Sequence, residues 1–228
     1  MSRDHTPVRH PDCESLERRS LLASSAIIIS GNTITVRGDD TSDLILIDVR
    51  STNAGGKELR VEINGDVQHR DLAGITRIAV EGRGGDDTIV VDDDVVRGIY
   101  INGGIGNDTI TGGAGADTIK GGRGADAINA GRGNDLVEGN QGNDVLSGED
   151  GNDRLDGGDG RDSLFGGDGN DTLTGGKGTD QLFGERGSDT FFARDGEVDT
   201  VSGGGGTDRA QSDGLFFDGL SQIDQDLS

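Results

Sequence analysis

The chain has 228 residues, 43 of them glycine and only 2 proline, and its 43 acidic side chains outnumber the 21 basic ones. Its net charge of −22 excludes a protein that attracts nucleic acid or anionic lipid. The single cysteine, Cys13, excludes an internal disulfide framework. No apolar run approaches the roughly 18 residues of a membrane span.

Residues 1–25 are polar and charged and lack the layout of an ordinary secretory peptide. The run Glu-Ser-Leu-Glu-Arg-Arg-Ser-Leu-Leu at 14–22 resembles the short N-terminal motif of planctomycete extracellular proteins, with Cys13 in place of its phenylalanine. That resemblance implies export to an extracellular or cell-surface location. A twin-arginine signal at Arg18 and Arg19 and an amphipathic helical turn are the alternatives. We therefore assign 1–25 as an export-type or disordered segment.

Residues 26–101 alternate between apolar runs and turn signals, a pattern typical of strands. The turn pairs Gly31-Asn32 and Asn64-Gly65 predict two hairpins. Longer apolar runs that suit buried strands lie at 44–49, 75–80, 88–91 and 95–101. We expect irregular β-helix coils that cap the array after them, with an independent small β-sandwich as the alternative.

Residues 103–192 consist of one nine-residue phrase written ten times in succession, most clearly as Gly-Gly-Ile-Gly-Asn-Asp-Thr-Ile-Thr at 103–111. The fourth position is always glycine and the eighth is always apolar. Ala130 replaces the first glycine once, and Asn140, Glu149 and Glu185 replace the second. The sixth position is always aspartate: Asp108, Asp117, Asp126, Asp135, Asp144, Asp153, Asp162, Asp171, Asp180 and Asp189. Such strict phase predicts an all-β solenoid rather than a linker.

Glycines at the first, second and fourth positions permit positive φ and close backbone approach, so six residues can form a tight turn. The other three form a short strand whose eighth residue points inward. Two repeats then make one flattened coil of eighteen residues. This predicts that Asp108 stacks under Asp126 on one edge and Asp117 under Asp135 on the other.

Carboxylates stacked at a strand spacing of about 4.8 Å repel each other unless a cation lies between them. Aspartate and turn carbonyl oxygens are the hard ligands that suit calcium. The three histidines, His5, His10 and His69, lie outside the array, so no soft-ligand site is expected. The competing interpretation is that the aspartates only form Asx-turns and solubilise the stack.

The phrase Gly-Gly-x-Gly-x-Asp-x-apolar-x resembles the repeats-in-toxin (RTX), or hemolysin-type, calcium-binding nonapeptide. The resemblance implies a right-handed parallel β-roll that holds calcium between successive turns, with the ten aspartates as ligands. Asp87 and Asp208, in less regular copies, are further candidate ligands. Five turns on each edge leave four gaps, hence about eight ions. We expect the roll at 102–211 to fold only with calcium.

All six phenylalanines lie in the C-terminal third. Phe165 and Phe183 occupy ninth positions eighteen residues apart, so they should stack on one sheet face. Two interpretations stay open for the aromatic residues: a cap in which the tail 212–228 folds back through Leu215, Phe216 and Phe217, or a partner patch formed by Phe165, Phe183 and Phe192.

No motif of a metalloprotease or of a serine hydrolase occurs, and the histidines are scattered, so we expect no catalysis. The expected function is that of a secreted calcium-binding structural protein. A calcium-dependent adhesion or glycan-binding role, with a cell-surface glycan or protein partner, is the alternative. Ice binding is disfavoured because the third positions of the repeats form an irregular, charged row.

Overall fold

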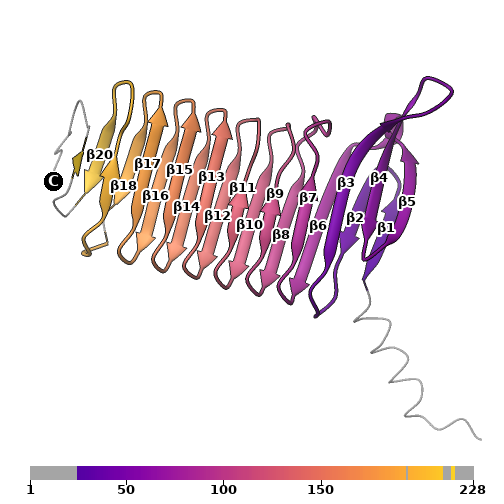
Figure 1. Cartoon of the computed structure of the whole chain (residues 1–228), viewed down its shortest axis with the longest axis horizontal. Helices are drawn as coiled ribbons and strands as arrows, with labels where there is room; N and C mark the ends of the chain where they lie inside the picture. The colour runs from indigo at the N-terminus through magenta and orange to yellow at the C-terminus, as the bar shows by residue number, and fades with distance from the viewer. Residues whose placement is uncertain (1–24, 194, 213–216, 219–228) are drawn as a thin grey trace, which may run out of the picture.

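The protein is an elongated solenoid of two facing sheets in this computed structural model, which describes residues 25–193, 195–212 and 217–218 (Figure 1). Its described part contains strands and one short 3-10 turn, η1 (Leu72–Gly74), and no α-helix. The predicted all-β parallel solenoid is therefore confirmed. The N-terminal export motif and the cap through Leu215 and Phe216 lie outside the described residues.

Two sheets run the whole length of the molecule. Sheet A has the order β1 (Ala26–Ser30), β2 (Thr33–Arg37), β6 (Arg77–Gly84), β8 (Tyr100–Ile105), β10 (Thr118–Arg123), β12 (Leu136–Gln141), β14 (Arg154–Asp159), β16 (Thr172–Lys177), β18 (Thr190–Ala193), β20 (Arg209–Ser212). Sheet B has the order β21 (Phe217–Asp218), β19 (Thr200–Ser202), β17 (Gln181–Arg186), β15 (Ser163–Asp168), β13 (Val145–Asp150), β11 (Ala127–Asn129), β9 (Thr109–Thr111), β7 (Thr88–Val91), β3 (Leu44–Ser51), β4 (Lys57–Ile63), β5 (Asp66–Asp71). Both sheets cross the boundary between the irregular region and the repeats without a break.

Adjacent parallel strands of the array pair residues eighteen positions apart, as with Leu146 opposite Leu164. One coil thus contains two repeats, as predicted. Most strands of the array are six residues long rather than three, because pairing continues into the next repeat, where Gly158 lies opposite Gly176. Glycines without side chains let the neighbouring backbones stay close enough to pair there.

The space between the sheets is filled by the eighth residue of every repeat. Ile119 and Leu155 from sheet A and Ile128 and Leu164 from sheet B are all at most 3% exposed. The same core cluster extends from Ile34 to Ala210. This continuous core favours coils that cap the array over an independent sandwich for residues 26–101.

The N-terminal end of sheet B is closed by two antiparallel strands, β4 and β5. The predicted hairpins at Gly31-Asn32 and Asn64-Gly65 are both present. The apolar run at 95–101 is not one strand, since β8 begins only at Tyr100.

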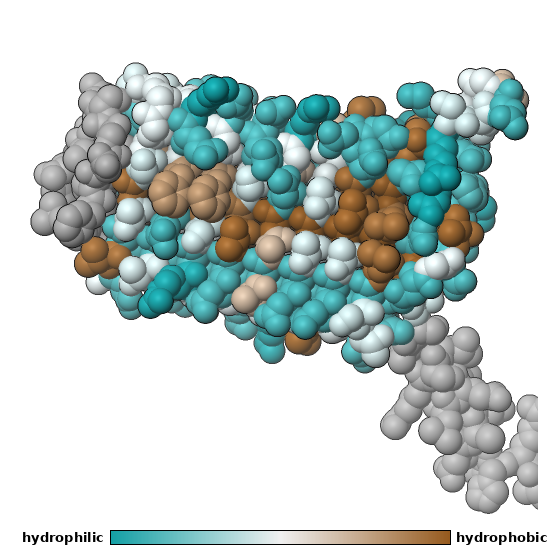
Figure 2. Space-filling model, viewed as in Figure 1, coloured by the Kyte–Doolittle hydropathy of each residue, from teal (hydrophilic) through white to brown (hydrophobic). Residues whose placement is uncertain are grey.

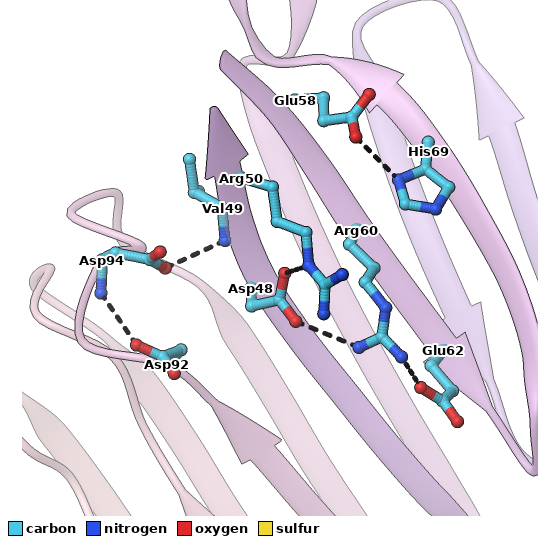
Figure 3. A network of polar contacts seen from close by, with 9 residues as sticks. All are labelled: Asp48, Val49, Arg50, Glu58, Arg60, Glu62, His69, Asp92 and Asp94. Atoms are coloured by element: carbon cyan, nitrogen blue, oxygen red, sulfur yellow. Dashed lines mark hydrogen bonds and ion pairs between the residues drawn. The ribbon is translucent and has the colours of Figure 1, made fainter. Parts of the chain in front are cut away.

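Charged side chains form a network of polar contacts on the strands of this end (Figure 3). The Asp48 carboxylate accepts from Arg50 at 3.0 Å and from Arg60 at 3.0 Å, and Arg60 also pairs with Glu62. His69 contacts Glu58 at 3.0 Å on the edge strand itself. Charges near an open edge discourage pairing with a further strand.

Hydrophilic residues cover most of the surface in the space-filling view, and an interrupted band of apolar residues follows its long axis (Figure 2). Within the described ranges, no helix is long and apolar enough to cross a membrane.

Candidate metal-binding ladders

An aspartate immediately precedes almost every strand of the array, at the point where the chain leaves a turn. The backbone N–H of Asp144 donates to Oδ1 of Asp162 in the next coil at 2.8 Å, and Ser163 N–H donates to the Asp144 carbonyl at 2.8 Å. Each aspartate is therefore fixed on both sides by its neighbours along the stack. The predicted pairs are confirmed, because Asp108 contacts Asp126 and Asp117 contacts Asp135 in the same way.

These contacts form two continuous ladders, one on each edge of the solenoid. The first ladder precedes strands of sheet B and consists of Asp43, Asp87, Asp108, Asp126, Asp144, Asp162, Asp180 and Asp199. The second ladder precedes strands of sheet A and consists of Asp117, Asp135, Asp153, Asp171, Asp189 and Asp208. All twelve predicted metal ligands belong to one of them.

Only Oδ1 takes part in the ladder contacts. The second carboxylate oxygen, Oδ2, is buried and accepts no hydrogen bond in ten of the aspartates: Asp87, Asp108, Asp126, Asp135, Asp144, Asp153, Asp162, Asp171, Asp180 and Asp189. A buried carboxylate oxygen without a donor is costly unless a cation or a proton compensates it. Its repetition at every coil indicates a binding position rather than a local defect.

The first glycine, present in nine of the ten repeats, leaves the space into which Oδ2 projects. A β-carbon on Gly139 would lie 2.5 Å from Oδ2 of Asp144 and 2.6 Å from the carbonyl oxygen of Gly157 in the next coil. The same pair of oxygens, from the repeat's own aspartate and the next coil's first glycine, meets at Gly38, Gly82, Gly103, Gly148, Gly157, Gly166 and Gly184. A carboxylate oxygen and a carbonyl oxygen thus approach the same point in one coil after another.

The three glycines of the phrase have different roles. Of the two properties expected of these glycines, positive φ and close backbone approach, the first glycine uses only the second: Gly139 and Gly157 do not adopt positive φ, and neighbouring oxygens fill the space where a β-carbon would lie. The second and fourth glycines do adopt it in most repeats, as in Gly158 at φ 104° and Gly160 at φ 148°. The replacements at the second position keep the left-handed backbone, with Asn140, Glu149 and Glu185 at φ 75°, 70° and 71°.

The repeat at 112–120 departs from this geometry. Oδ1 of Asp117 accepts from Ile99 N–H at 2.8 Å and Oδ2 accepts from Gly113 N–H at 3.0 Å, so both oxygens are already satisfied. The methyl group of Ala130 replaces a first glycine one coil later, and the strand before it, β11, ends after three residues. Asp117 is thus the predicted ligand least available to a cation.

Two aspartates of the first ladder, Asp43 and Asp199, were not among the predicted ligands. Asp199 lies nineteen residues after Asp180 rather than eighteen, so the strict frame missed it. Asp43 lies forty-four residues before Asp87, across the β4–β5 hairpin, although 42–45 already resembles the repeat. The triplet Asp-x-apolar before a strand is the signal that would have found both.

The first ladder ends at Asp43 with a cap made of protein groups. Asp39 N–H donates to Oδ2 at 2.8 Å, and Asn64 and Ser25 donate to Oδ1. Because both oxygens have donors, Asp43 closes the ladder, whereas Asp87 leaves one oxygen open.

Burial raises the pKa of eleven of the ladder carboxylates, and the donated backbone N–H offsets only part of the effect. From 3.8, the pKa rises to about 6 in Asp117, Asp126, Asp135, Asp144, Asp153, Asp162, Asp171, Asp180 and Asp189, and to about 7 in Asp87. The pKa of Asp108 is also raised, again mainly by burial. At neutral pH and without a cation, these carboxylates are therefore buried as charged groups with nothing positive to compensate them.

The donor set fits calcium. Among the described residues, no three His, Cys, Asp or Glu side chains come together at one point. A cation would therefore take few ligands from carboxylates, the open Oδ2 atoms, and most from backbone carbonyls such as that of Gly157. All are hard oxygens, which calcium accepts in sets of six to eight.

The predicted aromatic patch is only partly assembled. Phe165 and Phe183 stack on sheet B with ring centroids 5.1 Å apart and planes 10° from parallel, as expected. Phe192 belongs to β18 of sheet A, where it lies beside Thr174, so it does not join them. The rows of the two sheets alternate from one repeat to the next, and Phe192 follows Phe183 by nine residues rather than eighteen.

Comparison with known families agrees with this geometry. The family model of the RTX calcium-binding nonapeptide repeat matches four copies, at residues 102–137, 133–164, 156–191 and 174–210. No curated protein matches the chain. The matched segments contain both ladders from Asp108 onward, whereas Asp43 and Asp87 precede them. Residues 102–210 of this chain are therefore an array of RTX calcium-binding nonapeptide repeats.

Proposed function

We propose that the protein is an extracellular, non-enzymatic structural protein whose solenoid folds when calcium binds between its stacked turns. The observation that carries the proposal is the series of ten buried Oδ2 atoms without a hydrogen-bond donor. Calcium, when bound, supplies the positive charge that allows these carboxylates to stack. The ladder contacts through Oδ1 hold each carboxylate in place, and the first glycines keep the space beside Oδ2 open.

Eight gaps between turns belong to the ten regular repeats, so we expect about eight ions. The ladder positions at Asp87, Asp199 and Asp208 would add to this number of ions. Asp117, whose two carboxylate oxygens both accept a backbone hydrogen bond, would reduce it. An extracellular location suits such a device, because weak sites of this class fill at the calcium concentrations found outside cells.

The proposal is tested by titrating the metal-free full-length chain with calcium, using calorimetry for stoichiometry and far-ultraviolet circular dichroism for β-structure. We expect a stoichiometry near eight and a gain of β-signal that follows ion uptake. Magnesium at the same concentration is the control, and it should fail because it demands a small octahedral site. A spectrum that is the same in chelator and in millimolar calcium would refute calcium-coupled folding.

The location is tested separately, by immunodetection of the chain in the culture medium and cell-surface fraction of the source organism. Retention of the chain inside the cells would contradict the extracellular part of the proposal and leave the calcium part standing.

A further inference from the structure

The outward surface of sheet B has two central rows that carry no charged side chain. They run along eight strands, from β3 to β19, at the seventh and ninth positions of the repeats. One row is Leu44, Thr88, Thr109, Ala127, Val145, Ser163, Gln181 and Thr200, and the other is Leu46, Val90, Thr111, Asn129, Ser147, Phe165, Phe183 and Ser202. We call these sixteen residues the neutral face.

The neutral face is a property of sheet B alone. The same rows of sheet A contain Lys120, Glu138, Arg154, Asp156 and Arg209. Charged residues make up 28% of the chain, and its net charge is −22. Because the repeats alternate between the sheets, charges at every second repeat gather on sheet A, and sheet B is left without them.

The chemistry of the neutral face combines hydroxyl and amide groups with aromatic rings. Phe165 and Phe183 stack along the solenoid axis, so their outer ring faces point toward the next residues of the row, Ser147 and Ser202. Both neighbours are small. A hollow of about 560 Å³ lies beside the rings, and its lining also includes Ser202, Gly204 and three charged residues from outside the two rows, Asp168, Glu185 and Arg186.

We propose that the neutral face binds an uncharged polysaccharide that lies along the solenoid. The apolar face of a sugar ring would extend the phenylalanine stack, and the hydroxyl and amide groups of residues such as Thr111 and Gln181 would pair with sugar hydroxyls. The Asn129 amide and the Ser147 hydroxyl already donate to Glu149. Eight strands at about 4.8 Å give a face roughly 34 Å long, enough for several sugar residues. An acidic polymer is disfavoured because the protein stays acidic, at a net charge of about −6, when eight calcium ions offset its −22.

A second copy of the chain fits this surface less well. Three residues of strand across eight strands cover on the order of 400 Å², about half of what each partner of a stable complex buries. Two copies would also bring together two acidic bodies, each at a net charge of about −6 once eight calcium ions offset the chain's −22. A neutral, hydroxyl-rich chain meets neither obstacle.

The proposal rests on the proposed calcium-dependent folding, because the rows exist only in the folded solenoid. It is tested by affinity electrophoresis of the full-length chain in millimolar calcium, through gels containing hydroxyethyl cellulose, mixed-linkage β-glucan, xylan or galactomannan, with polygalacturonate as the acidic comparison. The face variant combines Thr111→Asp with Phe183→Ser. The matched control on sheet A combines Thr174→Asp with Phe192→Ser, also at ninth positions.

We expect at least one neutral polymer, but not polygalacturonate, to retard the wild-type protein. The face variant should lose about tenfold or more in affinity and the control variant should keep it. Circular dichroism on the same samples separates the two proposals: an unfolded wild type defeats calcium-coupled folding, whereas a folded wild type that no neutral polymer retards defeats this one. Equal loss in both variants, or self-association in sedimentation that only the face variant abolishes, would also overturn it.

Discussion

Asp144 and Asp162 lie eighteen residues apart and share one hydrogen bond, from the backbone N–H of Asp144 to Oδ1 of Asp162 at 2.8 Å. The other oxygen of Asp162 is buried without a donor. One carboxylate thus has a structural oxygen and an open oxygen, and this division makes the ladder a candidate metal site.

Replacing Asp162 with asparagine should raise the calcium concentration needed for half-maximal folding several-fold and remove at least one ion. Asparagine preserves an acceptor at the Oδ1 position but loses the charge that opposes calcium. The measurements are calorimetry and circular dichroism. Asp159→Asn is the matched control, because Asp159 is half exposed and pairs with Lys177 on the surface. Equal effects of the two variants would count against a ladder role for Asp162.

Gly157→Ala should destabilise the calcium-loaded protein by about 1–3 kcal/mol, the range found for overpacking. The added methyl group would lie 2.4 Å from Oδ2 of Asp162 and 2.5 Å from the carbonyl oxygen of Gly175. Urea unfolding in saturating calcium measures the loss. Gly205→Ala is the control, since its methyl group meets nothing closer than 3.8 Å. A neutral Gly157→Ala would show that the space is not needed.

Glu185→Gly should stabilise the protein by about 1 kcal/mol, because Glu185 adopts a left-handed backbone at φ 71° where glycine is strain-free. Thermal unfolding in saturating calcium provides the measurement. Gln181→Gly, in the same strand but in ordinary extended backbone, should instead be destabilising. A loss of stability on Glu185→Gly would mean that its side chain contributes more than its strained backbone costs.

Without calcium, acidification should favour the folded state. Nine ladder carboxylates, Asp126 and Asp162 among them, have pKa values raised from 3.8 to about 6, so the folded chain binds protons more tightly than the unfolded chain. The stability contribution of protonation is therefore fully present below pH about 4 and is lost as the pH rises through about 6.

Circular dichroism in chelator should accordingly show more β-structure at pH 5 than at pH 7, whereas calcium affinity should fall over the same acidification because protons compete for the same oxygens. A metal-free β-signal that increases with pH would contradict the raised pKa values. Calcium affinity that stays constant between pH 7 and pH 5 would argue against carboxylate ligands.

The sequence predicts the repeat geometry well because the signal is a period. The apolar eighth position, the turn glycines and the aspartates at intervals of nine require two repeats per coil, and Asp108 over Asp126 and Phe165 over Phe183 follow from that arithmetic. Strand length was underestimated, because pairing through glycine positions leaves no apolar signature in the sequence. The patch of three phenylalanines was wrong in part, because Phe192 falls on the other sheet.

By itself, the sequence determined the all-β solenoid, the identity of most ladder aspartates and the preference for hard oxygen ligands. Only the tertiary structure decided that the first ladder extends to Asp43 across an intervening hairpin, that Asp199 joins it despite the slipped frame, and that Asp117 has both oxygens satisfied. The physical reason is that the partner of a ladder aspartate is the aspartate that lies next to it in the neighbouring coil, whatever the number of residues between them along the chain. Insertions that form their own hairpin change the spacing along the chain and leave the stack intact.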